Sequence, residues 1–434
     1  MNIVESKKEF KKFLKDFEQY DSVVIPIQCD PKVHPIATEL CLLYFKLLDG
    51  DLNEYVLPFR HCDAINLDTE YLDKIKTSKD VFTHDKKKLL HFVEWSNISD
   101  VSMQFYLSKN KPLTIEDVTT TAHEYFYRTH YKTPNINCAI PIMKHIEFCR
   151  ELVDKKVKLA ALSGTKPMEG VYKIYNEVLH NLQRIESNGL QTTDGMVYSE
   201  YNPYTATGRP SNRFGGLNFA ALNKKDGSRE KFVSRYGKDG VLIEMDYDAY
   251  HLRLIGDVVD YRFPKGSVHK HMAKLYGVDY NEAKGLSFQY LYGHIPDEVI
   301  KTNPFFAKVQ IYIDNVWKQY KSNNFIESDI YSKRIYRENL SDMNKNKVFN
   351  YLIQLMETEN NMRMLTELLP KIDGYKTKLV LYSYDSFLFD FHISDGLKFI
   401  KMVKRTIEQK GKYPVRVARG SNYHQMKDIT EKFE

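Results

Sequence analysis

Residues 240–247 read GVLIEMDY, an apolar run that ends in Asp246 and Tyr247. A short run rich in aliphatic residues predicts a buried β-strand, with the aspartate at its end. Residues 379–391 read LVLYSYDSFLFDF and predict two more short strands, with Asp385 at the turn between them. The sequence therefore predicts a sheet in which two strands each deliver a carboxylate.

Asp246 and Asp385 have an ordinary and a functional interpretation. A single aspartate at the end of a strand is most often a turn former. Two on neighbouring strands repel each other unless they are solvated, paired or bound to a cation. Two Mg²⁺ ions held by carboxylates are the common device for in-line phosphoryl displacement, and Mn²⁺ can replace them. The pair therefore predicts a two-magnesium site.

A second pattern lies in residues 283–293, AKGLSFQYLYG, where Lys284, Phe288 and Tyr292 are four residues apart. On an α-helix this spacing puts a cation, a ring and a phenol on one face. Such a face suits a nucleotide, with the lysine on its phosphates and the rings on its sugar and base. The alternative is a half-buried amphipathic helix whose lysine reaches into solvent.

The composition of the whole chain limits the class of protein. Its 434 residues are 42% hydrophobic and 28% charged, which excludes a mostly disordered protein, a collagen and a coiled coil. The net charge of +6 permits a polyanionic partner without demanding one. No stretch approaches the ~20 apolar residues of a membrane span, and the N-terminus lacks the apolar core of a signal peptide. We therefore expect a cytoplasmic protein with no membrane partner.

The five cysteines all precede residue 150, and none of them forms a CxxC pair. This spacing argues against a zinc or redox motif. An odd number of cysteines without a secretion signal is typical of buried, reduced thiols in a cytosol-like compartment.

Four motifs resemble those of family A DNA polymerases, the bacterial DNA polymerase I group, and occur in the family's order. Residues 205–211, TATGRPS, resemble the segment TATGRLS, and residues 246–253, DYDAYHLR, resemble motif A, DYSQIELR. Residues 283–293 resemble motif B, AKxxxFxxxYG, and residues 384–386, YDS, stand where motif C has HDE. Asn350 and Gln354 fit the family's NxxxQ element. The resemblance covers about 190–434 well.

The resemblance implies an α/β (α+β) fold with the right-hand architecture of palm, fingers and thumb. The palm would comprise 196–262 and 341–434, the fingers 263–340, and a short thumb 146–195. Residues 1–145 faintly resemble the 3′–5′ exonuclease (ribonuclease H-like) domain of this family, with an unrelated α/β domain as the alternative. Pro26 and Gln28 stand where exonuclease acids would sit, and Leu89 about where another belongs. We therefore expect a degenerate exonuclease-like domain without proofreading.

Carried over residue by residue, the resemblance implies a catalytic centre for nucleotidyl transfer. Asp246 and Asp385 would bind the two metal ions, with the Tyr247 carbonyl completing a shell. Lys284 would bind the triphosphate and protonate the leaving group.

The resemblance also assigns contacts with the incoming nucleotide and with DNA. Phe288 would pack on the incoming sugar, and Tyr292 would stack near the templating base. DNA-binding roles fall to five further residues, namely Arg209, Asn350, Gln354, Arg253 and Tyr384.

Three positions depart from the family's pattern. His251 stands where the family has the glutamate that acts as a steric gate against a ribose 2′-hydroxyl. Tyr280 stands where an arginine contacts the triphosphate, and Ser386 replaces the glutamate of motif C. We expect His251 and Tyr280 in the nucleotide site, and His251 with Tyr292 to exclude ribonucleotides by bulk.

The sequence thus predicts a template-dependent DNA polymerase that adds dNTPs to a primer 3′-hydroxyl on primer-template DNA. We expect a compact, monomeric phage or mobile-element enzyme in the host cytoplasm, with a processivity factor or a helicase/primase as a further partner. A short thumb predicts low processivity. Two alternatives stay open: a ribonucleotide-tolerant polymerase or primer-maker, and an inactive nucleic-acid-binding replication subunit. The retained Asp246, Asp385 and Lys284 argue against the inactive subunit.

Overall fold

The computed structural model describes residues 1–49, 53–113, 133–162, 169–214, 217–223 and 226–433. The chain divides into two compact units, Met1–Ser187 and Asn188–Glu434. Each unit is built on its own main sheet. Within the described ranges, every helix falls short of the length or the apolar character that spanning a membrane requires.

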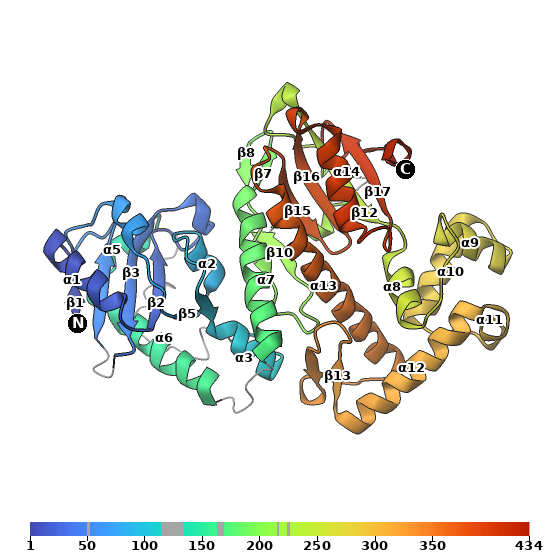
Figure 1. The fold of residues 1–434 in the computed structure, drawn as a ribbon, viewed down its shortest axis with the longest axis horizontal. Coiled ribbons are helices and arrows are strands. Elements are labelled where there is room, and N and C mark those ends of the chain that lie inside the picture. The colour runs from blue at the N-terminus through green and yellow to red at the C-terminus, as the bar shows by residue number, and fades with distance from the viewer. Residues whose placement is uncertain (50–52, 114–132, 163–168, 215–216, 224–225, 434) are drawn as a thin grey trace. The chain divides into compact units, whose positions relative to one another are not determined.

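The N-terminal unit contains a six-stranded mixed sheet of order β1-β4-β3-β2-β5-β6 (Figure 1). β2, β3 and β4 form an antiparallel meander, whereas β5 and β6 run parallel to β2. All of β2 is buried, as expected for a strand that is covered on both faces. The strands are β1 (Asn2–Ile3), β2 (Ser22–Gln28), β3 (Leu40–Leu47), β4 (Glu54–Pro58), β5 (Val81–Thr83) and β6 (Ile98–Asp100).

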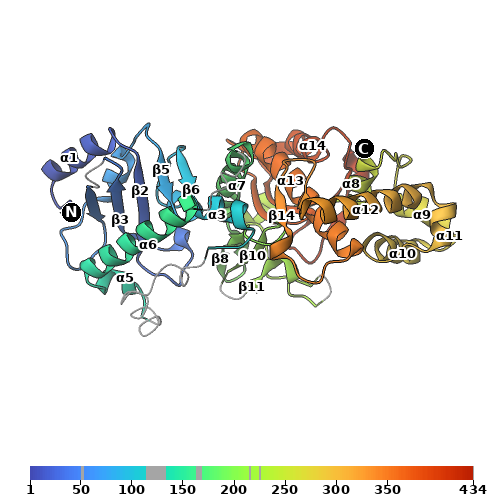
Figure 2. The ribbon, with the colours of Figure 1, turned by 90° about the horizontal axis from the view of Figure 1, so that it is seen from below.

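Helices cover both faces of this sheet (Figure 2). On one face, Phe13 and Phe17 of α1 share a core with Phe45 of β3. On the other face, Ile146 and Leu152 of α6 share a second core with β2 and β3. The helices are α1 (Lys7–Phe17), α2 (Lys86–Leu90), α3 (Val101–Lys109), α5 (Ile136–Ala139), α6 (Ile142–Leu162) and α7 (Glu169–Asn188).

The segment 146–195, expected to form a separate thumb, contributes α6 and almost all of α7 to the N-terminal unit. Arg150 of α6 donates from Nε to both carboxylate oxygens of Glu54 on β4, each at 2.9 Å. Asn176 of α7 donates to the Ile98 carbonyl at 2.9 Å. Apolar and ionic contacts thus bind these helices to the first sheet, and the boundary between the two compact units falls at 187/188.

The C-terminal unit contains a five-stranded antiparallel sheet of order β15-β16-β12-β17-β18. The strands predicted at 240–247 and on both sides of Asp385 are confirmed as β12, β15 and β16. α13 and α14 lie beside this sheet (Figure 1). The elements are β12 (Gly240–Tyr247), β15 (Lys378–Ser383), β16 (Ser386–His392), β17 (Val415–Gly420), β18 (Lys427–Asp428), α13 (Lys345–Ile372) and α14 (Gly396–Ile407).

A group of helices follows β12 and shares one core, in which Leu252, Phe305 and Ile353 are fully buried. Gly277 separates α9 from α10, because its left-handed backbone (φ 70°) ends α9. The helices are α8 (Tyr250–Val258), α9 (Val268–Tyr276), α10 (Tyr280–Tyr292), α11 (Asp297–Thr302) and α12 (Pro304–Asn323).

Short hairpins complete this unit. β7 pairs with β8, β10 pairs with both β9 and β11, and β13 pairs with β14, all antiparallel. The strands are β7 (Leu190–Thr192), β8 (Gly195–Val197), β9 (Tyr201–Asn202), β10 (Ser211–Phe214), β11 (Leu217–Asn218), β13 (Phe325–Glu327) and β14 (Arg334–Tyr336).

Candidate active site

The pairing of β12 with β16 brings Asp246 and Asp385 to neighbouring positions. Asp246 lies opposite Ser386, the first residue of β16. The backbone N–H of Tyr247 donates to the carbonyl of Asp385 at 3.0 Å. Both predicted carboxylates therefore lie at one end of the central sheet.

A strained turn holds Asp385 in this position. Ser383 pairs with Ser386, so Tyr384 and Asp385 form a two-residue hairpin loop, and Tyr384 has a left-handed backbone with φ 59°. That conformation is unfavourable for a bulky side chain. The Asn361 side chain of α13 compensates by donating to the Tyr384 carbonyl at 2.6 Å.

The electrostatic surroundings of the pair favour a cation. Asp385 is exposed to solvent, although neighbouring protein atoms partly desolvate its carboxylate. This partial desolvation, together with the negative charge of Glu357, raises the pKa of Asp385. Arg416 of β17 lies opposite Asp246, with its Nη2 4.0 Å from a carboxylate oxygen.

A third carboxylate, Glu244, lies on the same strand face as Asp246. It accepts hydrogen bonds from the Ser386 hydroxyl at 3.1 Å and from the Tyr423 hydroxyl at 3.0 Å. Ser386, the residue that replaces the motif C glutamate, is therefore engaged by an acid from the neighbouring strand.

Oxygen ligands of this kind suit Mg²⁺, which is usually bound by one or two carboxylates together with substrate phosphates and water. Within the described parts of the chain, the clusters of three or more potential metal ligands lie elsewhere. The two carboxylates of Asp246 and Asp385 thus fit a Mg²⁺ ion whose remaining ligands are substrate phosphates and water.

Glu357 of α13 is a central residue that the sequence reasoning missed. Its side chain is fully buried, and one oxygen lies 3.2 Å from Nε2 of His251 and 3.1 Å from Nε of Arg209. Burial by itself raises the pKa of Glu357, but its interactions with His251 and Arg209 outweigh burial and lower the pKa. The available signal was spacing, since Glu357 follows Asn350 by two helical turns and shares its face.

His251 connects this buried acid to α10. Its Nδ1 is hydrogen-bonded to the Tyr292 hydroxyl. The ring is therefore held from two sides, by Glu357 and by Tyr292.

The face of α10 presents the predicted set of side chains together. The rings of Phe288 and Tyr292 are parallel within 3°, with centroids 6.0 Å apart. Lys284 and Tyr280 are exposed at the other end of the helix. Buried His269 of α9 supports this face, with its ring 5.7 Å from Phe288 and 5.9 Å from Tyr280. The sequence reasoning missed His269 as well.

The predicted DNA-binding residues differ in how they are engaged. The Arg209 guanidinium lies 3.7 Å from the centre of the Tyr384 ring. Asn350 donates to the Tyr292 carbonyl at 3.1 Å, while its own side-chain oxygen is buried without a hydrogen-bond partner in the described structure. Gln354 lies one turn further along α13 and is half-buried.

Arg253 is held by protein groups. It donates to the Asp248 carbonyl at 2.9 Å and to the Gly266 carbonyl at 2.9 Å. It also contacts the Asp248 carboxylate at 3.2 Å. Its guanidinium therefore stabilises the start of α8.

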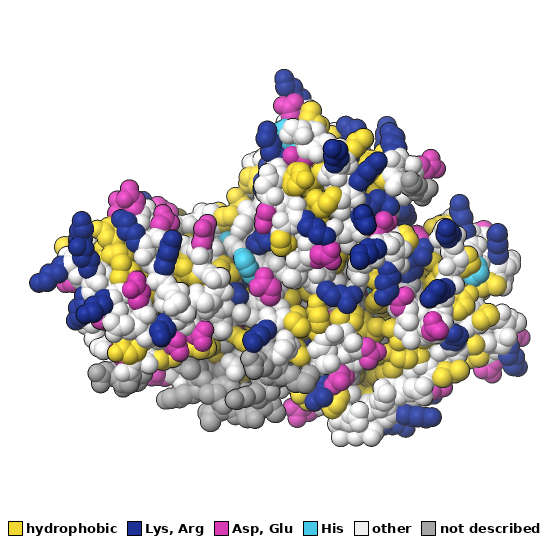
Figure 3. All heavy atoms as spheres, viewed as in Figure 1, with side chains coloured by type: hydrophobic (Ala, Val, Ile, Leu, Met, Phe, Trp, Pro, Cys, Tyr) yellow, Lys and Arg dark blue, Asp and Glu magenta, His cyan; other side chains and the backbone are white. Residues whose placement is uncertain are grey.

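Basic side chains gather on the visible face of the C-terminal unit, over α13 and α8 (Figure 3).

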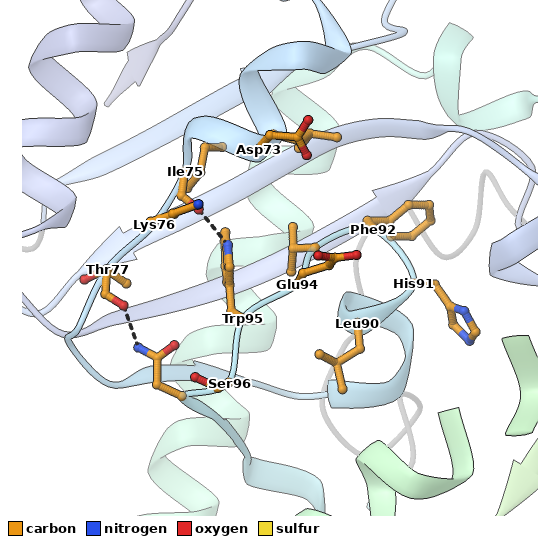
Figure 4. A pocket seen from close by; sticks show the side chains of 13 residues that line it. Asp73, Ile75, Lys76, Thr77, Leu90, His91, Phe92, Glu94, Trp95 and Ser96 are labelled. Carbon is orange, nitrogen blue, oxygen red and sulfur yellow. Dashed lines mark hydrogen bonds between the residues drawn. The ribbon is translucent and has the colours of Figure 1, made fainter. Parts of the chain in front are cut away.

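The N-terminal unit contains a cavity of about 670 Å³, apart from the candidate active site (Figure 4). Trp95 lines this cavity and donates to the Ile75 carbonyl at 2.7 Å. Its acidic residues, Asp73 and Glu94, come from separate segments.

Comparisons with known proteins agree with this architecture at the level of fold. No protein-family model matches the sequence, and no curated protein matches it. Among solved structures, the chain is similar to the POL domain of Pol1 from M. smegmatis, in a complex with DNA primer-template and dNTP. The TM-score is 0.68 at 13% identity, over 98% of this chain and 100% of that one. At this identity the likeness shows the fold alone, and that fold is a polymerase domain.

Proposed function

We propose that the chain is a template-dependent DNA polymerase that extends a primer by two-metal nucleotidyl transfer. The observation that carries the proposal is the meeting of Asp246 and Asp385 at the end of one sheet. The parallel rings on α10 and the likeness to a polymerase domain with primer-template and dNTP support it. The resemblance of four sequence motifs to those of family A polymerases supports the same function.

Each residue of the candidate site would have a separate role in nucleotidyl transfer. Asp246 and Asp385 would hold two Mg²⁺ ions, which when bound would activate the primer 3′-hydroxyl and neutralise the leaving pyrophosphate. Lys284, exposed on α10, binds the triphosphate and donates a proton to the leaving group. Phe288 packs on the incoming sugar, and Tyr292 lies next to the templating base.

We assign sugar selection to His251 together with Tyr292. His251 takes the place of the family's gate glutamate, and Glu357 with the Tyr292 hydroxyl orients its ring. A ring fixed from two sides excludes an added 2′-hydroxyl by bulk, because it cannot rotate away.

We propose that the N-terminal unit is a degenerate, ribonuclease H-like exonuclease domain. Its antiparallel meander followed by two parallel strands supports this topology. Gln28 of β2 donates to the carbonyls of Asp30 and Val33, at 2.6 and 2.8 Å, and so stabilises the loop that follows β2. Asp85 and Asp100, after β5 and at the end of β6, cap α2 and α3. These acids stabilise helices, which supports an absence of proofreading.

Primer extension on a primed DNA template with Mg²⁺ tests the polymerase proposal. dNTPs are compared with rNTPs, in the wild-type protein and in Asp385→Ala. We expect extension with dNTPs alone and its loss in the variant. Extension with both nucleotide types would favour a primer-maker, and tight primer-template binding without extension would favour an inactive subunit.

A further inference from the structure

A cluster of thiols and imidazoles is buried in the N-terminal unit, where the proposed polymerase chemistry makes no use of it. The ligand atoms of Cys41, His61 and His145 all lie within 4.8 Å of one another. These three residues are at most 2% exposed. They come from β3, from the segment after β4, and from α6, which shares one core with β3.

Two further cysteines adjoin this cluster. The thiol of Cys138, on α5, lies close enough to interact with Cys41 and with both imidazoles. The thiol of Cys29, directly after β2, interacts with Cys41 and Cys138. Cys138 therefore interacts with all three members of the cluster, with Cys41 directly and with the two imidazoles through its charge.

Both imidazoles are oriented in the way that metal-binding histidines are. His61 donates from Nε2 to the Ile140 carbonyl at 2.9 Å, and His145 donates from Nε2 to the Asn137 carbonyl at 2.8 Å. These hydrogen bonds leave the lone pair of each ring on Nδ1 and fix the ring, which is the usual support of a metal ligand. His61 Nδ1 accepts the Asp63 N–H at 3.0 Å, a contact that a bound cation would replace.

The cluster is surrounded by apolar packing. It lies in the core formed by β2, β3 and α6, where Cys29, Cys41 and Ile146 pack together. Water is excluded from such a core, so each polar group there needs a protein partner, and a bound cation would serve all of them at once.

We propose that Cys41, Cys138, His61 and His145 bind one Zn²⁺ ion in a closed, structural site, with Cys29 beside it. A set of two thiolates and two imidazoles is a common structural zinc site and disfavours Mg²⁺. Zinc–ligand bond lengths put tetrahedral ligands about 3.3–3.8 Å apart, so small side-chain rotations close the cluster. The ion would tie the β2–β3 hairpin to α5 and α6.

The test measures metal in the full-length protein, purified without chelators from zinc-supplemented cells. We expect one zinc per chain by elemental analysis, lost in Cys138→Ser and in His145→Gln. Cys62→Ser is the matched control, because Cys62 is exposed and neighbours His61 without joining the cluster, and it should keep the metal.

A measurement on the unaltered chain keeps the proposal testable if the variants fold poorly. Co²⁺ added to chelator-treated protein should give the absorption bands of tetrahedral thiolate coordination, and Zn²⁺ should remove them. Zn²⁺ should also raise the melting temperature, because it binds the folded state. A protein without zinc that gives no Co²⁺ spectrum would overturn the proposal, as would a disulfide between two of the clustered cysteines.

Discussion

Nε2 of His251 lies 3.2 Å from a carboxylate oxygen of Glu357, which is buried on α13. In family A polymerases the position of His251 holds the glutamate itself. Here the carboxylate comes from another helix, and the imidazole stands between that carboxylate and the Tyr292 hydroxyl. The proposed gate residue and the carboxylate that orients it are thus two separate side chains.

This relationship predicts how nucleotide selection responds to substitution. In His251→Ala the ring is lost, and discrimination against rNTPs should fall by roughly 10–200-fold, the range for one packing contact. Glu357→Gln should cause a smaller loss of discrimination, because the His251 ring remains but its contact with residue 357 is weakened. The measurement is the ratio of kcat/KM for dNTP and rNTP in single-nucleotide insertion.

The matched control is His180→Ala, which removes an imidazole from the N-terminal unit, where it pairs with Glu177. It should leave the ratio unchanged. A His251→Ala enzyme that discriminates as well as the wild type would contradict the assignment.

The strained turn before Asp385 predicts a positioning effect of Asn361. Asn361→Ala removes the donors to the Tyr384 carbonyl and the Tyr382 hydroxyl, so the left-handed Tyr384 loses its support. We expect extension to slow on the order of 100-fold, because a displaced catalytic group is costly. Primer-template affinity, measured by anisotropy, should stay near the wild-type value.

Asn360→Ala is the control for Asn361→Ala, because it removes an equally buried amide that does not contact the turn. It should retain most of the extension rate. Equal losses in the two variants would point to a general packing defect of α13.

The ion pair between Arg150 and Glu54 predicts a contribution to stability. Arg150→Met should lower the free energy of unfolding by about 1–3 kcal/mol, because it leaves a largely buried carboxylate without its main partner. Urea denaturation at neutral pH measures this change. Lys144→Met, which removes an exposed pair with Glu147 on the same helix, should change the stability little.

The same pair predicts a pH dependence. Burial alone raises the pKa of Glu54, but hydrogen bonds from Arg150 and Tyr44 outweigh it and lower the pKa. As pH falls below the ordinary value of 4.5, the unfolded chain takes up the proton first, so this stabilisation is progressively lost. Glu54→Gln should therefore flatten the decline of stability in acid, and an unchanged slope would argue against the pair.

The capping roles of Asp85 and Asp100 predict that the protein has no proofreading nuclease. Single-stranded DNA incubated with Mg²⁺ and the Asp246→Ala protein should stay intact, because the acids near the strand ends are engaged by helix N-termini. Magnesium-dependent shortening of the DNA by that variant would show that a nuclease site exists in the N-terminal unit.

The packing of α6 into the N-terminal core predicts low processivity. The side chains of Ile146, Phe148 and Leu152 are buried in that core and cannot contact duplex DNA. Fewer phosphate contacts mean weaker binding and faster dissociation. Extension in the presence of a DNA trap should give short products. Long products from a single encounter would contradict this expectation.

The local elements of this protein could be predicted from its sequence, because their signals are short-range. The apolar run 240–247 and the two runs on either side of Asp385 are typical of strands, and all three strands are present. The spacing of Lys284, Phe288 and Tyr292 predicted a shared helix face, since one turn separates successive residues. The motif order additionally indicated a polymerase fold.

Only the tertiary structure decided which distant groups meet. Arg209 and Glu357 are 148 residues apart in sequence, and no local pattern marks a glutamate as the partner of His251. The cysteine spacing argued against a zinc site, because the groups that form the thiol–imidazole cluster are far apart in the sequence. His61, for example, lies 79 residues from the Ile140 carbonyl that orients it. Periodicity records which face of an element is buried, whereas the partner on that face depends on how the elements pack. The sequence alone therefore determined the strands, helices and motif positions, and packing decided the support of His251, the unit of α6 and the thiol–imidazole cluster.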